Sequence, residues 1–328
     1  MFLICMEETM QKTFRKIQVC KLLNGYELSL PLHEFSCNEP GPTLGLSATI
    51  HGDEDLPIEI LRQFSLELEN LDFKGRVLIL PVANPLALGT FTRNNPIDMS
   101  NLNTVFPGAQ GWNVGSKEKE GTLSEKIANA IIKEYVPKVN YNIDFHSGGA
   151  VPTVEYTCWY HSNSEEIGKM VGQKYLYKAN LYPGSMQYYF VQQDKPAIIG
   201  EFGGGGQNNK YYIKQGITGI KNVMKYLKMI DGEPILPEAQ YNIKELFIIN
   251  SKHGGVFCPN IGIESMHAVI PKGNLLGVTY SPYTFEEIER FYGPFDRNLV
   301  ILLRADVCRV ESGEVMLMIG NMDTAIQI

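Results

Sequence analysis

Residues 41–54 have the sequence Gly-Pro-Thr-Leu-Gly-Leu-Ser-Ala-Thr-Ile-His-Gly-Asp-Glu, and this stretch decides the fold. The Gly-Pro pair predicts a turn, and the apolar run up to Ile50 predicts a buried strand. His51 and Glu54 follow at once, with two residues between them. Because ligand sites of open α/β sheets lie at the carboxyl ends of parallel strands, these two side chains can converge on one metal ion. Imidazole nitrogen and carboxylate oxygen are both good zinc donors.

Apolar strands alternate with amphipathic helices in the part of the chain before residue 231. Ser124 is expected to cap the helix that it begins. Strands that are apolar on both faces predict an α/β fold with a mostly parallel sheet, covered by helices on both sides. The expected strands are 41–50, 75–82, 140–145 and 197–202, and the expected helices are 55–71, 124–135 and 213–229.

The character of the sequence changes near residue 231, where Asp-Gly-Glu-Pro-Ile-Leu-Pro has the turn chemistry of a linker. Short β-type runs separated by Gly and Pro follow, and they predict a small all-β unit of about 85 residues. We therefore expect an α/β domain over residues 1–235 and a β-sandwich or barrel-like appendage over residues 236–328. The expected strands of the appendage are 245–250, 255–258, 266–270, 275–279, 298–304 and 315–319.

The composition narrows the range of partners and compartments. The chain has 328 residues, 44% of them apolar and 20% charged, and its net charge is −7. This acidic balance argues against bulk binding to nucleic acid or to an anionic membrane, since both attract basic surfaces. Six scattered cysteines favour reduced thiols in a cytoplasmic protein. Residues 1–8 lack the pattern of a signal peptide, and no apolar run is long enough for a transmembrane helix.

A third metal ligand is expected at the end of another strand, because a catalytic zinc ion usually has three protein ligands. His146 closes the run Asn-Tyr-Asn-Ile-Asp-Phe-His and precedes a glycine turn. Asp144 lies on the same face of that strand and is expected to accept a hydrogen bond at or near the metal. Each of these motifs alone is common in proteins without a metal, but two of them at strand ends favour a metal site.

Glu201 ends the run Ala-Ile-Ile-Gly-Glu and is followed by Phe-Gly-Gly-Gly-Gly. A carboxylate beside a metal can act as a general base, taking a proton from water and delivering it to a leaving amine. The alternative is that Glu201 merely caps the glycine turn. No Gly-Lys-Ser/Thr follows the glycines, so a phosphate-binding loop is not expected.

The polar segment 83–108 is too long for an ordinary connection, and long loops are usually functional or disordered. Arg93 lies within it. Its permanent positive charge could hold a developing oxyanion, although an arginine taken alone is more often a solvated surface residue.

Taken in order along the chain, these motifs resemble those of the succinylglutamate desuccinylase/aspartoacylase family, a branch of the zinc carboxypeptidase-like fold. The resemblance implies a mixed, mostly parallel eight-stranded sheet between helices. It also implies one zinc ion per chain, held by His51, Glu54 and His146. Glu201 takes the position of the general base and acid, and Arg93 that of the arginine polarising the scissile carbonyl. The resemblance covers residues 20–328 and rests on segments 51–54, 84–85, 93, 98, 101–103, 106–108, 144–149 and 201–203.

One position departs from the family pattern. The family usually has an arginine after Asn-Leu-Asn, and that arginine binds a substrate carboxylate, whereas here Thr104 follows Asn103. Threonine cannot form a bidentate clamp. We therefore expect Asn103 and Thr104 to face a substrate without the usual free carboxylate, or another cation such as Lys195 or Arg297 to read that carboxylate. Loss of activity is the remaining alternative.

The resemblance implies a zinc-dependent hydrolase that cleaves the amide bond of a small N-acylated amino acid or amine. A carboxypeptidase-type metallopeptidase is one alternative, and an inactive zinc-binding or scaffold homologue is another. The expected partner is a small acylated substrate, with no nucleic acid and no membrane, and a homo-oligomer stays open.

The β tail is similar to a biotinyl/lipoyl-type sandwich, but it shows no hairpin lysine of the kind that carries such a cofactor. We expect it to be a structural lid or an oligomer contact. The remaining histidines are expected at the surface or in packing contacts, with His161 a weaker candidate for the pocket wall; they are His33, His161, His253 and His267.

Overall fold

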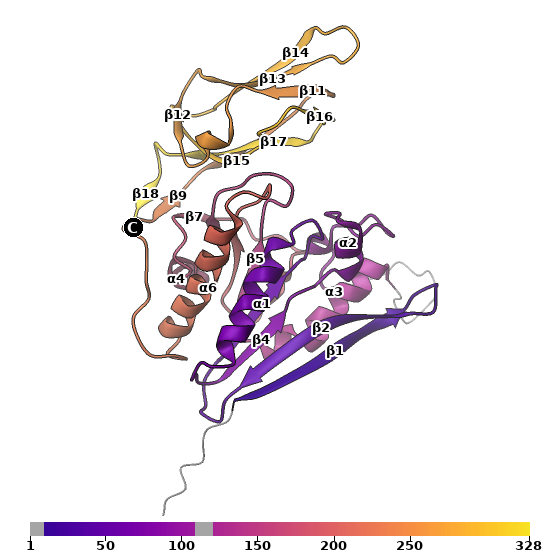
Figure 1. Ribbon diagram of the computed structural model, residues 1–328, viewed down its shortest axis with the longest axis vertical. Coiled ribbons are helices and arrows are strands. Elements are labelled where there is room, and N and C mark those ends of the chain that lie inside the picture. Colours follow the sequence, from indigo (N-terminus) through magenta and orange to yellow (C-terminus); the bar gives the residue numbers. More distant parts are fainter. Residues whose placement is uncertain (1–9, 109–120) are drawn as a thin grey trace, which may run out of the picture.

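The computed structural model describes residues 10–108 and 121–328 (Figure 1). The expectation about a signal peptide concerns residues 1–8, which lie outside the described part of the chain. Within the described part, no helix is long and apolar enough to cross a membrane.

A ten-stranded sheet forms the centre of the molecule. Parallel pairs join β4–β3, β3–β5, β5–β8, β6–β7 and β7–β9, and the other four neighbours are antiparallel. The predicted mixed, mostly parallel α/β sheet is therefore confirmed. In spatial order the strands are β1 (Gln11–Lys21), β2 (Glu27–Ser36), β4 (Arg76–Leu80), β3 (Thr43–Ala48), β5 (Tyr141–His146), β8 (Ala197–Glu201), β6 (Tyr156–Trp159), β7 (Tyr175–Lys178), β9 (Tyr241–Ile243) and β18 (Ile326–Gln327).

The strand count exceeds the expected eight because the C-terminal part of the chain adds β9 and β18 to one edge. The opposite edge is a long antiparallel ribbon of β1 and β2, which the sequence did not reveal (Figure 1). Nearly every side chain of β1 is exposed or partly exposed, and Ile17 is its one fully buried residue. Because only Ile17 and the partly buried Val19 and Cys20 of β1 pack on the core, its alternating apolar pattern is too short to read.

Helices cover both faces of the sheet, as expected. On one face, α1, α4 and α6 pack over a continuous apolar cluster, and on the other face α3 and α5 pack over a second one. The helices are α1 (Leu56–Leu68), α2 (Pro85–Thr90), α3 (Leu123–Glu134), α4 (Ser162–Met170), α5 (Met186–Val191) and α6 (Asn209–Tyr226), with the short 3₁₀ turns η1 (Leu102–Thr104), η2 (Val136–Lys138) and η3 (Ile263–Ser265).

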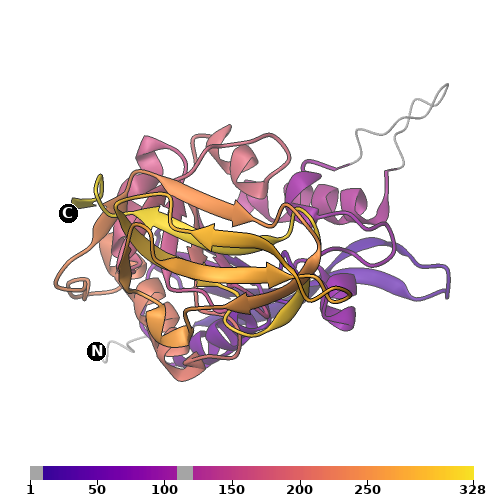
Figure 2. The ribbon, with the colours of Figure 1, turned by 90° about the horizontal axis from the view of Figure 1, so that it is seen from above.

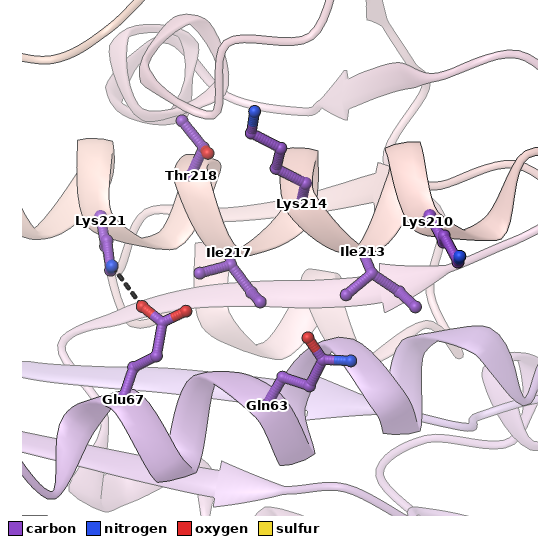
Figure 3. Close-up of a pocket in the computed structure, with 8 residues that line it drawn as sticks. All are labelled: Gln63, Glu67, Lys210, Ile213, Lys214, Ile217, Thr218 and Lys221. Carbon is purple, nitrogen blue, oxygen red and sulfur yellow. Dashed lines mark ion pairs between the residues drawn. The ribbon is translucent and has the colours of Figure 1, made fainter.

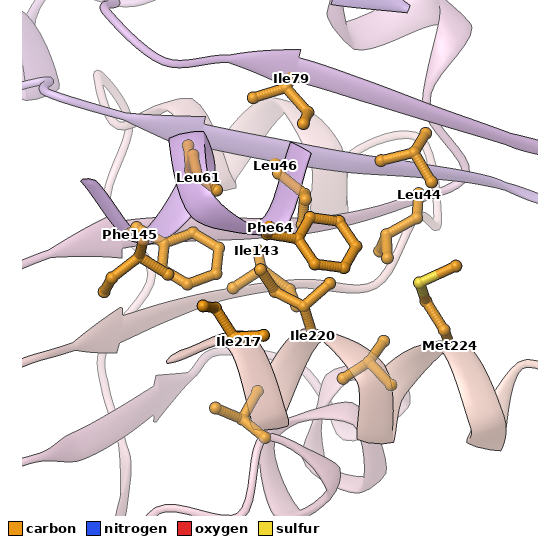
Figure 4. Close-up of a cluster of buried hydrophobic side chains, with 14 of the residues drawn as sticks. Leu44, Leu46, Leu61, Phe64, Ile79, Ile143, Phe145, Ile217, Ile220 and Met224 are labelled. Carbon is orange, nitrogen blue, oxygen red and sulfur yellow. The ribbon is translucent and has the colours of Figure 1, made fainter. Parts of the chain in front are cut away.

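The two central strands send alternate side chains to the two faces. Leu44 and Leu46 of β3 join Ile143 and Phe145 of β5 beneath α1 and α6, where Phe64 fills the space between them (Figure 4). Each of these side chains is almost fully buried. Burial of one such side chain contributes roughly 1.5–3 kcal/mol, so this cluster holds the two strands and two helices in register.

The opposite face of the same strands is polar, and there the prediction of strands apolar on both faces is wrong. Gly45 and Ser47 of β3 lie directly across from Asn142 and Asp144 of β5. His146 continues the row to the end of β5. Polar side chains are tolerated in a buried sheet when they bond to one another, and these do.

Helix α3 begins earlier than expected, and Ser124 is not its cap. Thr122 is the cap, and it exchanges hydrogen bonds with Glu125 in a capping box. Ser124 instead donates both its backbone N–H and its hydroxyl to Asp98. The polar segment 83–108 is thus fastened to α3, and it contains the short helix α2, which the sequence did not predict.

The C-terminal part forms two four-stranded antiparallel sheets, as the β-type runs predict (Figure 2). It contacts the loop between β5 and β6 through an isolated bridge between Thr153 and Leu302. The division at residues 235 and 236 stays a prediction. One sheet is ordered β10 (Leu246–Asn250), β17 (Val315–Asn321), β15 (Arg297–Leu303) and β12 (Val269–Pro271), and the other β14 (Glu287–Tyr292), β13 (Leu275–Tyr280), β11 (Gly255–Pro259) and β16 (Cys308–Val310).

Candidate metal centre

Three buried side chains meet at the carboxyl ends of β3 and β5. The Nδ1 atom of His51 lies 2.7 Å from one Glu54 oxygen, and the Nδ1 atom of His146 lies 2.9 Å from the other. One ligand atom of each residue lies within 4.8 Å of the other two. All three residues are at most 3% exposed. This group could bind a metal ion.

The turn from His51 to Glu54 is shaped by its contact with α2. Gly52 packs so tightly there that a Cβ would lie 2.0 Å from the carbonyl carbon of Ala87. Asn84 donates its side-chain amide to the carbonyl of Ile50 and accepts a hydrogen bond from the Ala87 amide at the start of α2. Glycine at this position and asparagine before α2 therefore set the path of the metal-binding turn.

Both histidine rings are oriented by an acceptor behind them. The Nε2 atom of His51 lies 3.2 Å from the side-chain oxygen of Asn101, and that of His146 lies 3.0 Å from Asp144. When Nε2–H donates to these oxygens, Nδ1 keeps its lone pair and faces the centre of the site. The residues therefore fit a metal: two imidazole nitrogens and a carboxylate, already aimed at one point.

The charges of Glu54, His51 and His146 strongly change one another's pKa values. Burial alone would raise the pKa of Glu54, but the charges of His146 and His51 outweigh it and hold that pKa well below its usual range. Burial would lower the pKa of His146, yet the carboxylates of Glu54 and Asp144 raise it well above its usual value. Burial lowers the pKa of His51. Because a metal must replace the proton on His146, metal affinity should fall as the pH is lowered.

Arg93 lies at the rim of this group. Its side chain is 57% exposed and donates a hydrogen bond of 3.1 Å to Glu54. The guanidinium thus has one end beside the candidate metal ligands and the other in solvent, which is where an incoming carbonyl oxygen could meet it.

Glu201 lies beside His146 in the neighbouring strand. The two residues are partners in the parallel β5–β8 ladder, so their side chains leave the same face of the sheet about 4.8 Å apart. Burial and then the negative charge of Glu54 raise the pKa of Glu201 to about 7. A carboxyl group with such a pKa can both accept and return a proton near neutral pH.

A wall of tyrosines was missed by the sequence analysis. Tyr156 of β6 pairs with Glu201 in the antiparallel β6–β8 ladder, and Cys158 and Tyr160 follow on the same face. Burial raises the pKa of Tyr182, while the nearby charges of His146 and Arg93 act to lower it. The alternation Tyr-x-Cys-x-Tyr indicates that Tyr156, Cys158 and Tyr160 share one face of a strand. Only the pairing of β6 with β8 shows that this face is the one that carries Glu201.

The structure gives Asn103 and Thr104 different surroundings. Asn103 is 5% exposed, and its side-chain oxygen accepts a hydrogen bond from the backbone amide of Met186 at the start of α5. Thr104 is exposed and donates its hydroxyl to the backbone of Asn101. It borders a hollow of about 370 Å³ that Gly184 also lines.

Neither alternative cation lies at the site. Lys195 precedes β8, at the end of the strand opposite Glu201, and its ammonium donates to the carbonyls of Val136 and Pro137. Arg297 begins β15 in the C-terminal part and donates to the carbonyl of Met322. The suggestion that either one replaces the family arginine is therefore wrong.

The remaining histidines lie outside the group. His33 is on β2 and packs on Phe14, and the exposed His161 precedes α4 and caps it. His253 is exposed, and His267 approaches the buried Glu155 at 3.4 Å. None of these four positions adds a ligand to the metal group among the described residues.

A second hollow, of about 430 Å³, lies between α1 and α6, on the face of the sheet that these helices cover (Figure 3). Ile213 and Ile217 form its floor, and an ion pair of Lys221 with Glu67 closes one end. It shares no residue with the metal group.

Comparison with known proteins agrees with this geometry. The succinylglutamate desuccinylase/aspartoacylase catalytic domain matches residues 40–227. The N-alpha-acetyl-L-2,4-diaminobutyric acid deacetylase of Halomonas elongata is 29% identical over 212 residues, which are 60% of this chain and 58% of that protein. The succinylglutamate desuccinylase of Shewanella denitrificans is 33% identical over 109 residues, 33% of this chain and 28% of that protein. The matched regions thus cover less than two thirds of either relative.

Solved structures share the fold over nearly the whole chain. The product-bound ectoine utilization protein EutE (DoeB) of Ruegeria pomeroyi superposes with a TM-score of 0.82, at 24% identity and 96% coverage of both chains. A succinylglutamate desuccinylase of Silicibacter sp. TM1040 gives a TM-score of 0.80, at 21% identity and 97% coverage of both. With the catalytic-domain match spanning more than half of its length, the chain belongs to the succinylglutamate desuccinylase/aspartoacylase family.

Proposed function

We propose that this protein is a zinc-dependent hydrolase that removes the acyl group from a small N-acylated amino acid or amine. The observation that carries the proposal is the convergence of His51, Glu54 and His146 beside the carboxylate of Glu201. Two histidines and a glutamate are a ligand set of catalytic zinc sites. When bound, zinc supplies Lewis acidity to a substrate carbonyl and to a water molecule.

In this proposal Glu201 moves the proton. It takes a proton from the attacking water as the new carbon–oxygen bond forms, and it gives that proton to the nitrogen as the amide bond breaks. The raised pKa of Glu201, about 7, supports both halves of this role.

Arg93 is proposed to hold the negative charge that develops on the carbonyl oxygen. Its contact with Glu54 supports this role, because the hydrogen bond holds the partly exposed guanidinium at the rim of the metal group. A preorganised donor of this kind typically contributes a factor of about 10² to 10³ in rate.

The two named relatives support the reaction class, since one is a deacetylase and the other a desuccinylase of acylated amino acids. What distinguishes this chain is the exposed Thr104 in place of an arginine. We infer that the preferred substrate lacks the carboxylate that the family arginine would clamp, and that Tyr156 of β6 and Tyr160, which follows that strand, form the wall against which its leaving group lies.

The C-terminal sheets are proposed to form an appendage, with residues 1–235 as the catalytic domain and residues 236–328 as the second. The contact of Thr153 with Leu302 supports a role in bracing the loop that follows His146. We also propose that the protein works in the cytoplasm. Cys20, Cys158, Cys258 and Cys308 form no disulfide, which is in keeping with a reducing compartment.

A panel of acylated amines and amino acids tests the activity directly. Amine release is measured for the zinc-loaded wild type and for Glu201→Gln, which keeps the shape of the side chain and removes its basicity. We expect turnover of at least one acylated substrate by the wild type and retention of zinc without turnover by the variant. Equal rates for the two proteins would remove Glu201 from the mechanism.

A further inference from the structure

A continuous row of buried polar side chains runs behind the metal centre, from Tyr135, the residue that follows α3, to β5. The hydroxyl of Tyr135 donates to Asn142 at 2.7 Å, and Asn142 donates to Ser47 at 3.3 Å. Ser47 donates to one oxygen of Asp144 at 2.7 Å. The other oxygen of Asp144 lies 3.0 Å from the Nε2 atom of His146. Four of these side chains are fully buried, and His146 is 3% exposed.

Asp144 is held from a second direction by α5. The side-chain amide of the buried Gln187 donates to the same Asp144 oxygen that faces His146, at 2.8 Å. The other end of that amide, its oxygen, has no hydrogen-bond partner among the described residues. Helix α5 is itself fixed one residue earlier, where the Met186 amide donates to Asn103. Among the described residues, the one hydrogen bond that the Gln187 side chain makes is therefore the bond that it donates to Asp144.

The fold makes room for this row. Gly45 lies across from Asn142 in the β3–β5 ladder, and a Cβ there would lie 2.5 Å from the Tyr135 hydroxyl and 2.8 Å from the Asn142 oxygen. The backbone of Gly45 does not have a positive φ, so conformation does not require glycine. The space is needed for the polar pair itself.

Packing alone does not explain such a row. Replacing buried hydrogen-bonded partners by apolar groups of the same shape is often neutral or even stabilising. The polar side chains instead fix an orientation, because the Asp144 carboxylate, which is hydrogen-bonded at both oxygens, cannot rotate.

We propose that Ser47 and Gln187 are positioning residues for His146: they lock both oxygens of Asp144, which holds the His146 ring with Nδ1 aimed at the metal. The inference rests on the proposed metal-dependent function. It extends the site to β3 and α5, two elements that supply no metal ligand.

The test is zinc affinity, measured by competition with a chromophoric chelator on folded, metal-stripped protein. Ser47→Ala and Gln187→Met each remove one bond to Asp144, and we expect each to weaken zinc binding about tenfold, at the low end of what loss of such outer partners causes. Ser164→Ala is the matched control, because Ser164 is also fully buried and hydrogen-bonded but lies in α4. Its zinc affinity should equal that of the wild type.

A double-mutant cycle separates positioning from a general loss of structure. If Ser47 acts through Asp144, adding Ser47→Ala to Asp144→Ala costs no further affinity, whereas an equal further loss would overturn the inference. Unchanged affinity in both single variants would overturn it while leaving the proposed function intact. A wild type that binds no zinc would overturn the proposed function as well. Should a Ser47 variant fail to fold, Gln187→Met decides alone, since it leaves no new buried donor unpaired.

Discussion

Glu155 allows a direct test of the electrostatics in this structure, because it is a buried carboxyl group with few hydrogen bonds or positive charges to offset its loss of water. It is 2% exposed, and its Oε2 atom has no hydrogen-bond partner among the described residues. Tyr211 approaches the other oxygen at 3.4 Å. His267 lies 3.4 Å away, but burial lowers its pKa, so it brings little positive charge at neutral pH.

Burial raises the pKa of Glu155 from 4.5 to about 7 in the folded protein. The folded state therefore binds the proton more tightly than the unfolded state, and stability must fall as the pH rises between these two values. At about 1.4 kcal/mol per pH unit, the loss reaches up to about 3 kcal/mol above the folded pKa. Below pH 4.5 the group is protonated in both states and has no such effect.

Glu155→Gln mimics the protonated form at every pH. We expect the variant and the wild type to have similar unfolding free energies near about pH 4.5, and the variant to be more stable by up to about 3 kcal/mol near about pH 8. Urea unfolding of metal-stripped protein across this range measures the difference. Glu238→Gln, at an exposed position, is the control and should not alter the pH dependence. A constant difference between Glu155→Gln and the wild type would refute the reasoning.

Three further predictions concern the site. Because Glu201 must be deprotonated to act as a base and its pKa is raised to about 7, kcat/KM should fall as the pH is lowered through that value; a flat profile would contradict its role. Gly52→Ala should weaken zinc binding at least about tenfold, since its Cβ would collide with the α2 backbone. Gly89→Ala in the same helix, where a Cβ meets nothing within 4 Å, should have no effect, and equal affinities would disprove the steric argument. Thr104→Arg should raise kcat/KM for substrates with a free carboxylate, whereas Thr104→Gln should not; no change in preference would refute the specificity proposal.

The candidate metal site was accessible to sequence analysis because its residues end apolar strands. His51, Glu54, His146 and Glu201 each follow a run that predicts a strand, and parallel strands bring such ends together without further information. The same argument gave the central strands and the covering helices α1, α3 and α6.

The parts that escaped prediction depend on strand register. Ser47 and Asp144 are 97 residues apart, and they bond because β3 and β5 pair in one particular alignment. Tyr156 meets Glu201 only because β6 runs antiparallel to β8, against the direction of the central strands. The packing of the whole core determines which strands pair and in which register. Strands as short as β6 and β7, with four residues each, have too few residues for their sequence to predict their partners.

The most direct test of the account is the metal dependence of turnover. Protein stripped with a chelator should release no amine from a substrate identified in the panel, and about one equivalent of zinc per chain should restore the full rate, as the three-ligand site requires. Stripped protein that remains as active as the zinc-loaded form would contradict the central claim.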